Sequence, residues 1–121
     1  MSKTILTVDD SRTMRDMLLL ALQDAGYTVI QAVDGVDGLE TLAAKGADVV
    51  ITDINMPRMD GFGFIEGMRA DPNHRTTPVL VLTTESDAEK KARARAAGAT
   101  GWIVKPFDPV KLVDAVRRVA A

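Results

Sequence analysis

The sequence VVITDINMPRMDG occupies residues 49–61 and begins with four apolar or β-branched residues that end at an aspartate, Asp53. A short continuous run rich in Val and Ile is typical of a β-strand that is covered on both faces. The residues that follow include Pro57 and the pair Asp60-Gly61, which are typical of a turn. Residues 49–61 therefore predict a buried parallel strand that is followed at once by a carboxylate.

Runs of the same kind recur on both sides of this stretch and alternate with helical patterns. The predicted strands cover residues 4–8, 28–33, 48–52, 79–83 and 101–104. Apolar residues at i, i+3 and i+4 spacing predict helices within residues 14–25, 38–44, 62–69 and 87–97, and a last helix that is entered through Asp108-Pro109. Five βα units predict right-handed crossovers, one parallel sheet and helices on both of its faces, which is an α/β fold.

The predicted helix at residues 87–97 differs from the others in its apolar content. Only Ala88, Ala92 and Ala96 form an apolar stripe on it, although its helix propensity is high. We therefore expect this helix to bury little surface and to be among the least firmly held elements. Two interpretations follow, an ordinary solvated surface helix or a docking and switching face.

Length and composition limit the organisation of the chain. Its 121 residues, of which 46% are hydrophobic, predict one domain, residues 1–121, without an effector domain. Residues 1–60 carry 10 acidic and 5 basic side chains and residues 61–121 carry 7 and 10, which does not resemble a nucleic-acid-binding surface. There is no cysteine, and no apolar run approaches the length of a membrane span. These features predict a soluble cytoplasmic protein without a membrane partner.

Four charged side chains follow directly on predicted strands. Asp9 and Asp10 follow the first strand, Asp53 the third and Lys105 the fifth. The carboxyl ends of parallel strands meet at one edge of the sheet, where ligands of open α/β sheets bind. Three carboxylates that lie close together repel each other, and one lysine cannot neutralise them. A divalent cation with oxygen ligands, Mg²⁺, resolves this repulsion, so the pattern indicates a site for phosphoryl chemistry.

The order and spacing of four motifs identify a known family. LTVDDSRTMR, VVITDINMPRMDG, VLVLTTES and GWIVKPF together resemble the receiver domain of two-component response regulators, in its single-domain chemotaxis (CheY-type) form. The resemblance covers essentially the whole chain. It implies a flavodoxin-like doubly wound (βα)5 domain with a five-stranded parallel sheet in the order 2-1-3-4-5.

The resemblance also implies a role for each acidic residue. Asp53 accepts a phosphoryl group from the phosphohistidine of a histidine kinase. Asp10 ligates Mg²⁺ directly, Asp9 acts mostly through metal-bound water, and the backbone carbonyl of Asn55 supplies a further ligand. The structural alternatives are that Asp53 only caps a helix and that Asp9 or Asp10 only stabilises the positive end of the first helix.

Three further residues are implied to read the phosphorylation state. Lys105 neutralises charge on the phosphoryl group, and its bond to Pro106 is expected to be cis. Thr83 donates a hydrogen bond to a phosphoryl oxygen, and Trp102 occupies the position of a switch aromatic that is usually Tyr or Phe. The alternatives are a solvent-directed lysine and a partly buried strand residue.

Three side chains are implied to control the lifetime of the phosphoryl group by limiting the access of water, namely Asn55, Thr84 and Glu85. Thr84 is bulkier than Ala, which favours slower hydrolysis. His74 is the only histidine and lies in a loop that is rich in Pro and Asn. We expect it to be an exposed residue away from the acids, so the chain is not itself a phosphohistidine donor.

The predicted function is a Mg²⁺-dependent phosphoacceptor switch that is not an enzyme in the usual sense, although it assists its own phosphorylation and dephosphorylation. The expected partners are a histidine kinase, a flagellar motor switch protein and a phosphatase, with the protein itself a monomer. The target is expected to bind residues 87–97, the Trp102 strand and residues 110–120. An alternative is a phosphate sink or relay receiver that contacts no motor.

Two enzyme or cofactor classes are disfavoured by the same residues. A haloacid-dehalogenase-type phosphatase needs a second Asp two residues after its nucleophile, and this chain has Asn55 there, which cannot titrate. A flavin-binding module needs a phosphate-binding loop after the first strand, where VDDSRT instead places carboxylates.

Overall fold

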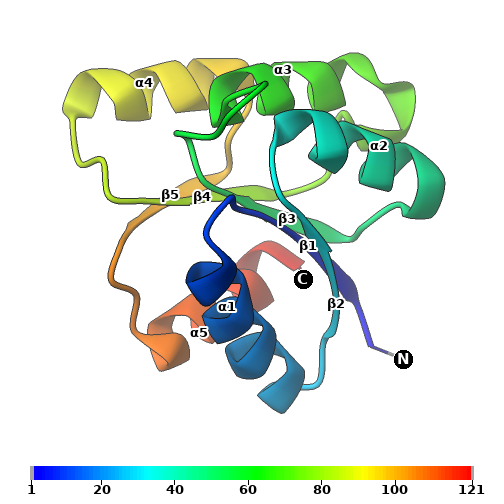
Figure 1. Cartoon of the computed structure of the whole chain (residues 1–121), viewed down its shortest axis with the longest axis vertical. Coiled ribbons are helices and arrows are strands. Elements are labelled where there is room, and N and C mark those ends of the chain that lie inside the picture. Colours follow the sequence, from blue (N-terminus) through cyan, green and yellow to red (C-terminus); the bar gives the residue numbers. More distant parts are fainter. Residues whose placement is uncertain (1, 121) are drawn as a thin grey trace.

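Five short strands form one parallel sheet in the computed structural model, which describes residues 2–120 (Figure 1). The order β2-β1-β3-β4-β5 confirms the predicted flavodoxin-like topology. The strands are β1 (Thr4–Val8), β2 (Thr28–Ala32), β3 (Val49–Thr52), β4 (Val79–Thr83) and β5 (Gly101–Val104). Because β1 lies between β2 and β3, the strand order reverses beside the end of β1, and a crevice opens there in sheets of this kind.

Helices cover both faces of the sheet. Figure 1 shows α1 and α5 on one face and α2, α3 and α4 on the other. Their bounds are α1 (Arg12–Asp24), α2 (Gly35–Lys45), α3 (Gly61–Ala70), α4 (Ala88–Ala97) and α5 (Pro109–Ala120), and a 3-10 turn, η1 (Pro72–His74), follows α3. Pro109 stands at the first position of α5, as predicted.

Two apolar cores result, one on each side of the sheet. Alternate residues of a strand point to opposite faces, so Ile5 packs with α1 and α5 while Leu6 and Val8 pack with α2 and α3. Every residue of β3 and β4 is buried. This burial on both faces explains why these strands read as continuous apolar runs.

The predicted bounds were closest for the strands and least accurate for α2. Strands β2 and β3 are each one residue shorter than predicted, whereas α2 begins at Gly35, three residues before the predicted start. The Asp34 side chain accepts a hydrogen bond from Asp37 N at 2.8 Å, and the Asp37 side chain accepts one from Val33 N at 2.9 Å. This reciprocal cap fixes a helix start that the glycines at positions 35 and 38 concealed.

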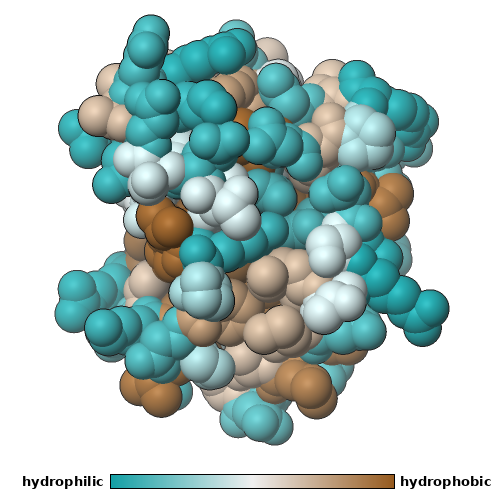
Figure 2. All heavy atoms as spheres, turned by 60° about the vertical axis from the view of Figure 1, so that its left-hand side comes forward, coloured by the Kyte–Doolittle hydropathy of each residue, from teal (hydrophilic) through white to brown (hydrophobic). Residues whose placement is uncertain are grey.

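The predicted packing face of α4 is wrong. Ala88, Ala92 and Ala96 are exposed, and the buried residue is Ala94. Alanines occupy several faces of this helix, so their spacing does not define which face packs against the protein. The packing face is set by contacts with α3, which include the Arg93 guanidinium 4.1 Å above the centre of the Phe62 ring. Figure 2 shows mainly hydrophilic side chains over the top of the molecule, where α4 lies. The expectation that α4 buries little is confirmed.

The prediction that His74 is an exposed residue is also wrong. His74 lies in η1 with 7% of its surface exposed, and its Nδ1 is 3.0 Å from Thr77 Oγ1. Its backbone carbonyl accepts a hydrogen bond from Arg69 at 2.8 Å. The Asp71-Pro72 break was predicted correctly, but the residues after it form a 3-10 turn in which His74 is buried. Within residues 2–120 no helix combines the length and apolar content that crossing a membrane requires.

Candidate functional site

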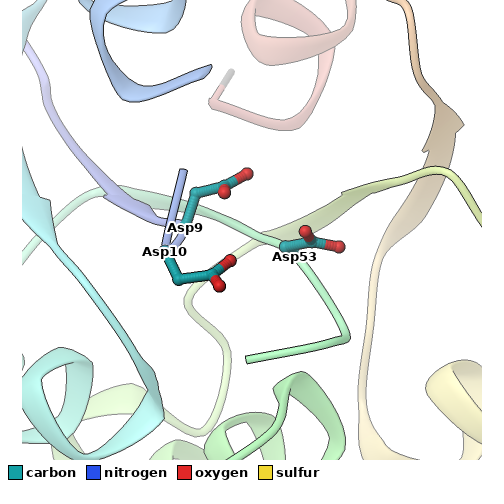
Figure 3. A group of neighbouring side chains, drawn as sticks. All are labelled: Asp9, Asp10 and Asp53. Atoms are coloured by element: carbon teal, nitrogen blue, oxygen red, sulfur yellow. The ribbon is translucent and has the colours of Figure 1, made fainter. Parts of the chain in front are cut away.

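Three aspartates from two neighbouring strands meet at the carboxyl edge of the sheet. Asp9 and Asp10 follow β1, and Asp53 follows β3; their carboxylates point to the same side (Figure 3). One oxygen from each carboxylate lies within 4.8 Å of the others. The backbone sets this arrangement, because β1 and β3 are paired in register up to Val8 and Thr52 and Asp53 N then donates to Val8 O at 2.9 Å. The predicted convergence of these residues is confirmed.

Lys105 reaches the same cluster from the end of β5. Its Nζ donates to Asp9 Oδ2 at 2.9 Å and to Asp53 Oδ2 at 3.0 Å, and only 10% of its side chain is exposed. Burial lowers the pKa of the ammonium group, but the hydrogen bonds and charges of Asp9 and Asp53 outweigh burial, so the Lys105 pKa is raised. The peptide bond between Lys105 and Pro106 is cis, as expected.

Asp9 is the most buried of the three acids. It is 2% exposed, and burial raises the pKa of its carboxyl despite the opposing hydrogen bonds from Lys105 and from Ser11 N. The bond from Ser11 N to Asp9 Oδ1 measures 2.9 Å. Asp9 is therefore held in one orientation, whereas Asp10 is exposed to solvent beside it.

The donor set fits a hard divalent cation. All three side chains offer oxygen atoms, and three carboxylates face a single ammonium group. Oxygen ligands with excess negative charge suit Mg²⁺, which keeps several waters and takes few protein ligands. Asp9, Asp10 and Asp53 would hold the ion.

The loop after β3 holds the Asp53 carboxylate from the other side. Ile54 N donates to Asp53 Oδ1 at 2.7 Å, and Gly61 N closes the loop by donating to Ile54 O at 2.8 Å. A Cβ atom on Gly61 would collide with the backbone carbonyl of Asp53. Residue 61 must therefore be glycine, because α3 begins in contact with the backbone of Asp53.

Glu85 connects the remaining predicted residues. Its carboxylate accepts a hydrogen bond from Asn55 Nδ2 at 3.0 Å and forms an ion pair with Lys90 at 3.1 Å. The hydrogen bond from Asn55 and then the contacts with Lys90 lower the Glu85 pKa. Its backbone N–H donates to Thr83 Oγ1 at 3.3 Å, and its carbonyl accepts from Trp102 Nε1 at 3.0 Å.

The structure thus divides the predicted residues into two groups. The first is the acidic cluster with Lys105, and the second is the set of side chains around Glu85. Thr83 is completely buried, Trp102 is half-buried against the α2–α3 core, and Thr84 is exposed directly after β4.

Sequence reasoning missed Arg58, which binds Asp34 from the loop after β3. The only local signal for this contact was the spacing of Asp34 and Asp37, which marks a helix cap but does not indicate an arginine partner.

Comparison with known proteins agrees with this geometry. The sequence profile of the response regulator receiver domain matches residues 5–117. The chain is 39% identical over 116 residues to chemotaxis protein CheY-3 of Vibrio cholerae, covering 95% of this chain and 89% of the relative. It is 36% identical over 116 residues to chemotaxis protein CheY of Pseudomonas aeruginosa, covering 95% of this chain and 94% of that one.

Solved structures show the same fold. The chemotaxis response regulator CheY4 of Vibrio cholerae superposes with a TM-score of 0.93 at 45% identity, covering 98% of this chain and 99% of its own. A putative response regulator from Chloroflexus aurantiacus gives a TM-score of 0.95 at 35% identity, covering 99% and 98%.

Proposed function

Because this chain belongs to the response regulator receiver domain family, we propose that it is a Mg²⁺-dependent phosphoacceptor switch of a chemotaxis phosphorelay, with Asp53 as the acceptor. Receiver domains of CheY type are signalling switches rather than enzymes. The observation that carries the proposal is Lys105 Nζ between Asp9 and Asp53, beside the third carboxylate of Asp10. The donor we propose is a histidine kinase in the cytoplasm.

The transfer uses Oδ2 of Asp53, the oxygen that accepts from Lys105 in this structure. This oxygen attacks the phosphorus of the kinase phosphohistidine, the P–O bond forms as the P–N bond breaks, and the imidazole leaves with the bonding electrons and takes a proton from solvent. Lys105 then bonds a phosphoryl oxygen in place of the Asp53 carboxylate. Bound Mg²⁺ supplies positive charge that neutralises the transferring group. Asp9, Asp10 and Asp53 would hold the cation, with the Asn55 backbone carbonyl as a further ligand.

The signal leaves the site through Thr83. We assign to the Thr83 hydroxyl a hydrogen bond to a phosphoryl oxygen on Asp53. When the hydroxyl moves toward that oxygen, it strains the 3.3 Å hydrogen bond that it accepts from Glu85 N. Trp102 follows because its indole is bonded to the carbonyl of the same residue. The Trp102 ring is already half-buried in this structure, so its movement would bury it further. Asn55, Thr84 and Glu85 set how long the phosphoryl group survives.

The output face consists of α4, β5 and α5. A hollow between α4 and β5 is lined by Lys91, Arg95 and Trp102. Lys90 and Arg93 are engaged with Glu85 and Phe62, so Lys91 and Arg95 supply its positive charge. An acidic segment of a target, such as a flagellar motor switch protein, suits this hollow.

Phosphorylation by a small donor tests the proposal. Acetyl phosphate with Mg²⁺ should add one phosphate to the intact mass, and hydroxylamine should remove it, as expected for an acyl phosphate. Asp53→Asn should abolish the addition. Asp60→Asn is the matched control, because Asn at position 60 can still cap α3 by accepting from Gly63 N. Labelling of the Asp53→Asn protein at the rate of the unsubstituted protein would disprove the assignment.

A further inference from the structure

The loop that joins Asp53 to α3 carries an arginine in an unusual backbone conformation. Arg58 has φ +63°, and among residues 2–120 no other non-glycine residue has a positive φ. Such a conformation is unfavourable for a residue with a side chain. Contacts with the rest of the protein must therefore stabilise the positive φ of Arg58. These contacts are made with a different part of the chain.

The contacts reach the turn between β2 and α2. Arg58 Nε donates to Asp34 Oδ2 at 2.8 Å, and its Nη2 donates to Asp34 Oδ1 at 3.1 Å. The Asp34 side chain is 5% exposed and also caps α2, whereas 58% of the Arg58 side chain is exposed. Two parallel hydrogen bonds to a buried carboxylate fix the direction of the guanidinium as well as its distance.

A second contact fastens the same two segments. Gly35 N donates to Met59 O at 3.1 Å. A Cβ atom at position 35 would lie 2.7 Å from that oxygen, so the backbones can approach this closely only because residue 35 is glycine. The loop is therefore anchored at Arg58 and Met59, between its contact with Asp53 and the start of α3.

The anchored loop controls the acidic cluster through its first residues. Ile54 N orients the Asp53 carboxylate, and Asn55 follows directly. We propose that the Arg58–Asp34 pair is a positioning element that keeps this loop ordered before the cation arrives and so raises the affinity of the site for Mg²⁺. A loop that is already ordered pays no ordering entropy on binding. This inference rests on the proposed function, because it takes Mg²⁺ as the ligand of the Asp9–Asp10–Asp53 cluster.

Three substitutions separate the pair from the fold. Arg58→Asn removes the guanidinium, while Asn tolerates a positive φ, so the backbone is not strained further. Arg58→Lys keeps the charge but cannot form two parallel bonds. Asp34→Asn keeps an oxygen that can cap α2 but loses the ionic partner. Arg118→Gln, which breaks an exposed pair with Asp114 on α5, is the matched control.

Calorimetric titration with Mg²⁺ alone measures the affinity without any phosphoryl transfer. We expect Kd to rise about tenfold in Arg58→Asn and Asp34→Asn, as is usual for groups that orient a metal ligand, and less in Arg58→Lys. The double variant Asp34→Asn/Arg58→Asn should be no weaker than either single one, since the pair acts as a unit. Arg118→Gln should match the unsubstituted protein.

Amide hydrogen exchange in the metal-free protein distinguishes positioning from general destabilisation. Residues 54–60 should exchange faster in Arg58→Asn, while the amides of β1 and β3 keep their protection. Equal Mg²⁺ affinity in the unsubstituted protein, Arg58→Asn and Asp34→Asn overturns the inference and leaves the proposed function standing. Absence of Mg²⁺ binding by the unsubstituted protein overturns both.

Discussion

Lys105 forms ion pairs with two of the three aspartates in the cluster, Asp9 and Asp53, but not with the third, Asp10. Among the ion pairs of residues 2–120, none includes Asp10. Asp9 and Asp53 therefore gain from the ammonium group, while Asp10 mainly adds repulsion until a cation binds. A residue of this kind is maintained for function at the expense of stability.

Asp10→Asn should therefore stabilise the metal-free protein and weaken its response to Mg²⁺. Mg²⁺ at ~100 times its Kd should stabilise the unsubstituted protein by about 2.7 kcal/mol, and the variant should lose most of this gain. Urea unfolding with and without Mg²⁺ measures both effects. Asp16→Asn, which loses only an exposed 4.0 Å pair with Arg12, is the control and should keep the full gain. An undiminished Mg²⁺ effect in Asp10→Asn would argue against direct ligation.

Thr7 and Thr52 offer a comparison between two fully buried hydroxyl groups. Thr52 Oγ1 donates to Asp53 O at 2.9 Å, whereas Thr7 Oγ1 has no hydrogen-bond partner within the described part of the chain. Thr7→Val should raise the free energy of unfolding by about 1 kcal/mol, because it removes an unpaired polar atom. Thr52→Val should lower it by a similar amount. Denaturant unfolding of both variants tests this, and a change of the same sign in both would contradict it.

The Arg58–Asp34 pair has a consequence for stability in acid. The hydrogen bonds from Arg58 and then from Asp37 N hold the Asp34 pKa below its ordinary value of 3.8. The unfolded chain therefore takes up this proton first as the pH falls, and the stability due to the ionised Asp34 is present above about pH 4 and lost below it. The difference in unfolding free energy between the unsubstituted protein and Asp34→Asn should shrink from about pH 6 to about pH 3. A difference independent of pH would show that the pKa of Asp34 is the same in the folded and unfolded states.

At the scale of the elements, Arg69 connects α3 with the end of α4. Its Nε and Nη2 donate to Gly98 O at 3.2 and 2.7 Å, and its Nη1 donates to His74 O at 2.8 Å. This anchors the carboxyl end of α4, whereas near its amino end Lys90 forms a partly exposed ion pair with Glu85. The two ends are therefore held unequally, which suits a helix that repacks at one end.

Arg69→Met should lower the free energy of unfolding by about 2 kcal/mol, because hydrogen bonds from a charged group are lost and carbonyls remain unpaired. Amide exchange in the last turn of α4 should accelerate more than exchange in α2. Arg95→Met is the control, since Arg95 is exposed on α4 and its loss should have little effect. Equal stability of Arg69→Met and Arg95→Met would show that Arg69 does not anchor α4.

The accuracy of the sequence predictions follows the range of the interactions that fix each element. Strands with continuous apolar runs, such as β4, were placed at their observed bounds because their buried residues are consecutive in the sequence. The packing face of α4, the burial of His74 and the contacts of Arg58 and Arg69 were not predicted. The contacts of Arg58 with Asp34 and of Arg69 with Gly98 join residues distant in the chain, and local spacing contains no information about which arginine meets which carbonyl or carboxylate. His74 instead contacts the nearby Thr77 and Arg69, and its loop composition did not reveal the 3-10 turn in which it is buried.

At the scale of the whole molecule, the acidic cluster and the proposed output face meet at Glu85. The convergence of Asp9, Asp53 and Lys105 was predictable, because parallel strands bring their carboxyl ends to one edge. The proposed path away from it was not predictable, since it uses the backbone N–H and carbonyl of Glu85, which every residue has. A shift of the switch from 1:99 to 99:1 needs about 5.5 kcal/mol of differential stabilisation by the phosphoryl group.

Trp102 reports this path directly, because it is the only tryptophan in the chain. Beryllofluoride with Mg²⁺, a mimic of the phosphoryl group, should change its emission intensity and reduce quenching by iodide as the half-buried ring moves inward. Thr83→Ala should weaken the response without changing Mg²⁺ affinity, because it removes the hydroxyl that accepts from Glu85 N and that we propose to bond the phosphoryl group. Thr13→Ala, an exposed change on α1, is the control. Identical iodide quenching with and without the mimic would mean that the signal leaves by a route other than Thr83, Glu85 and Trp102.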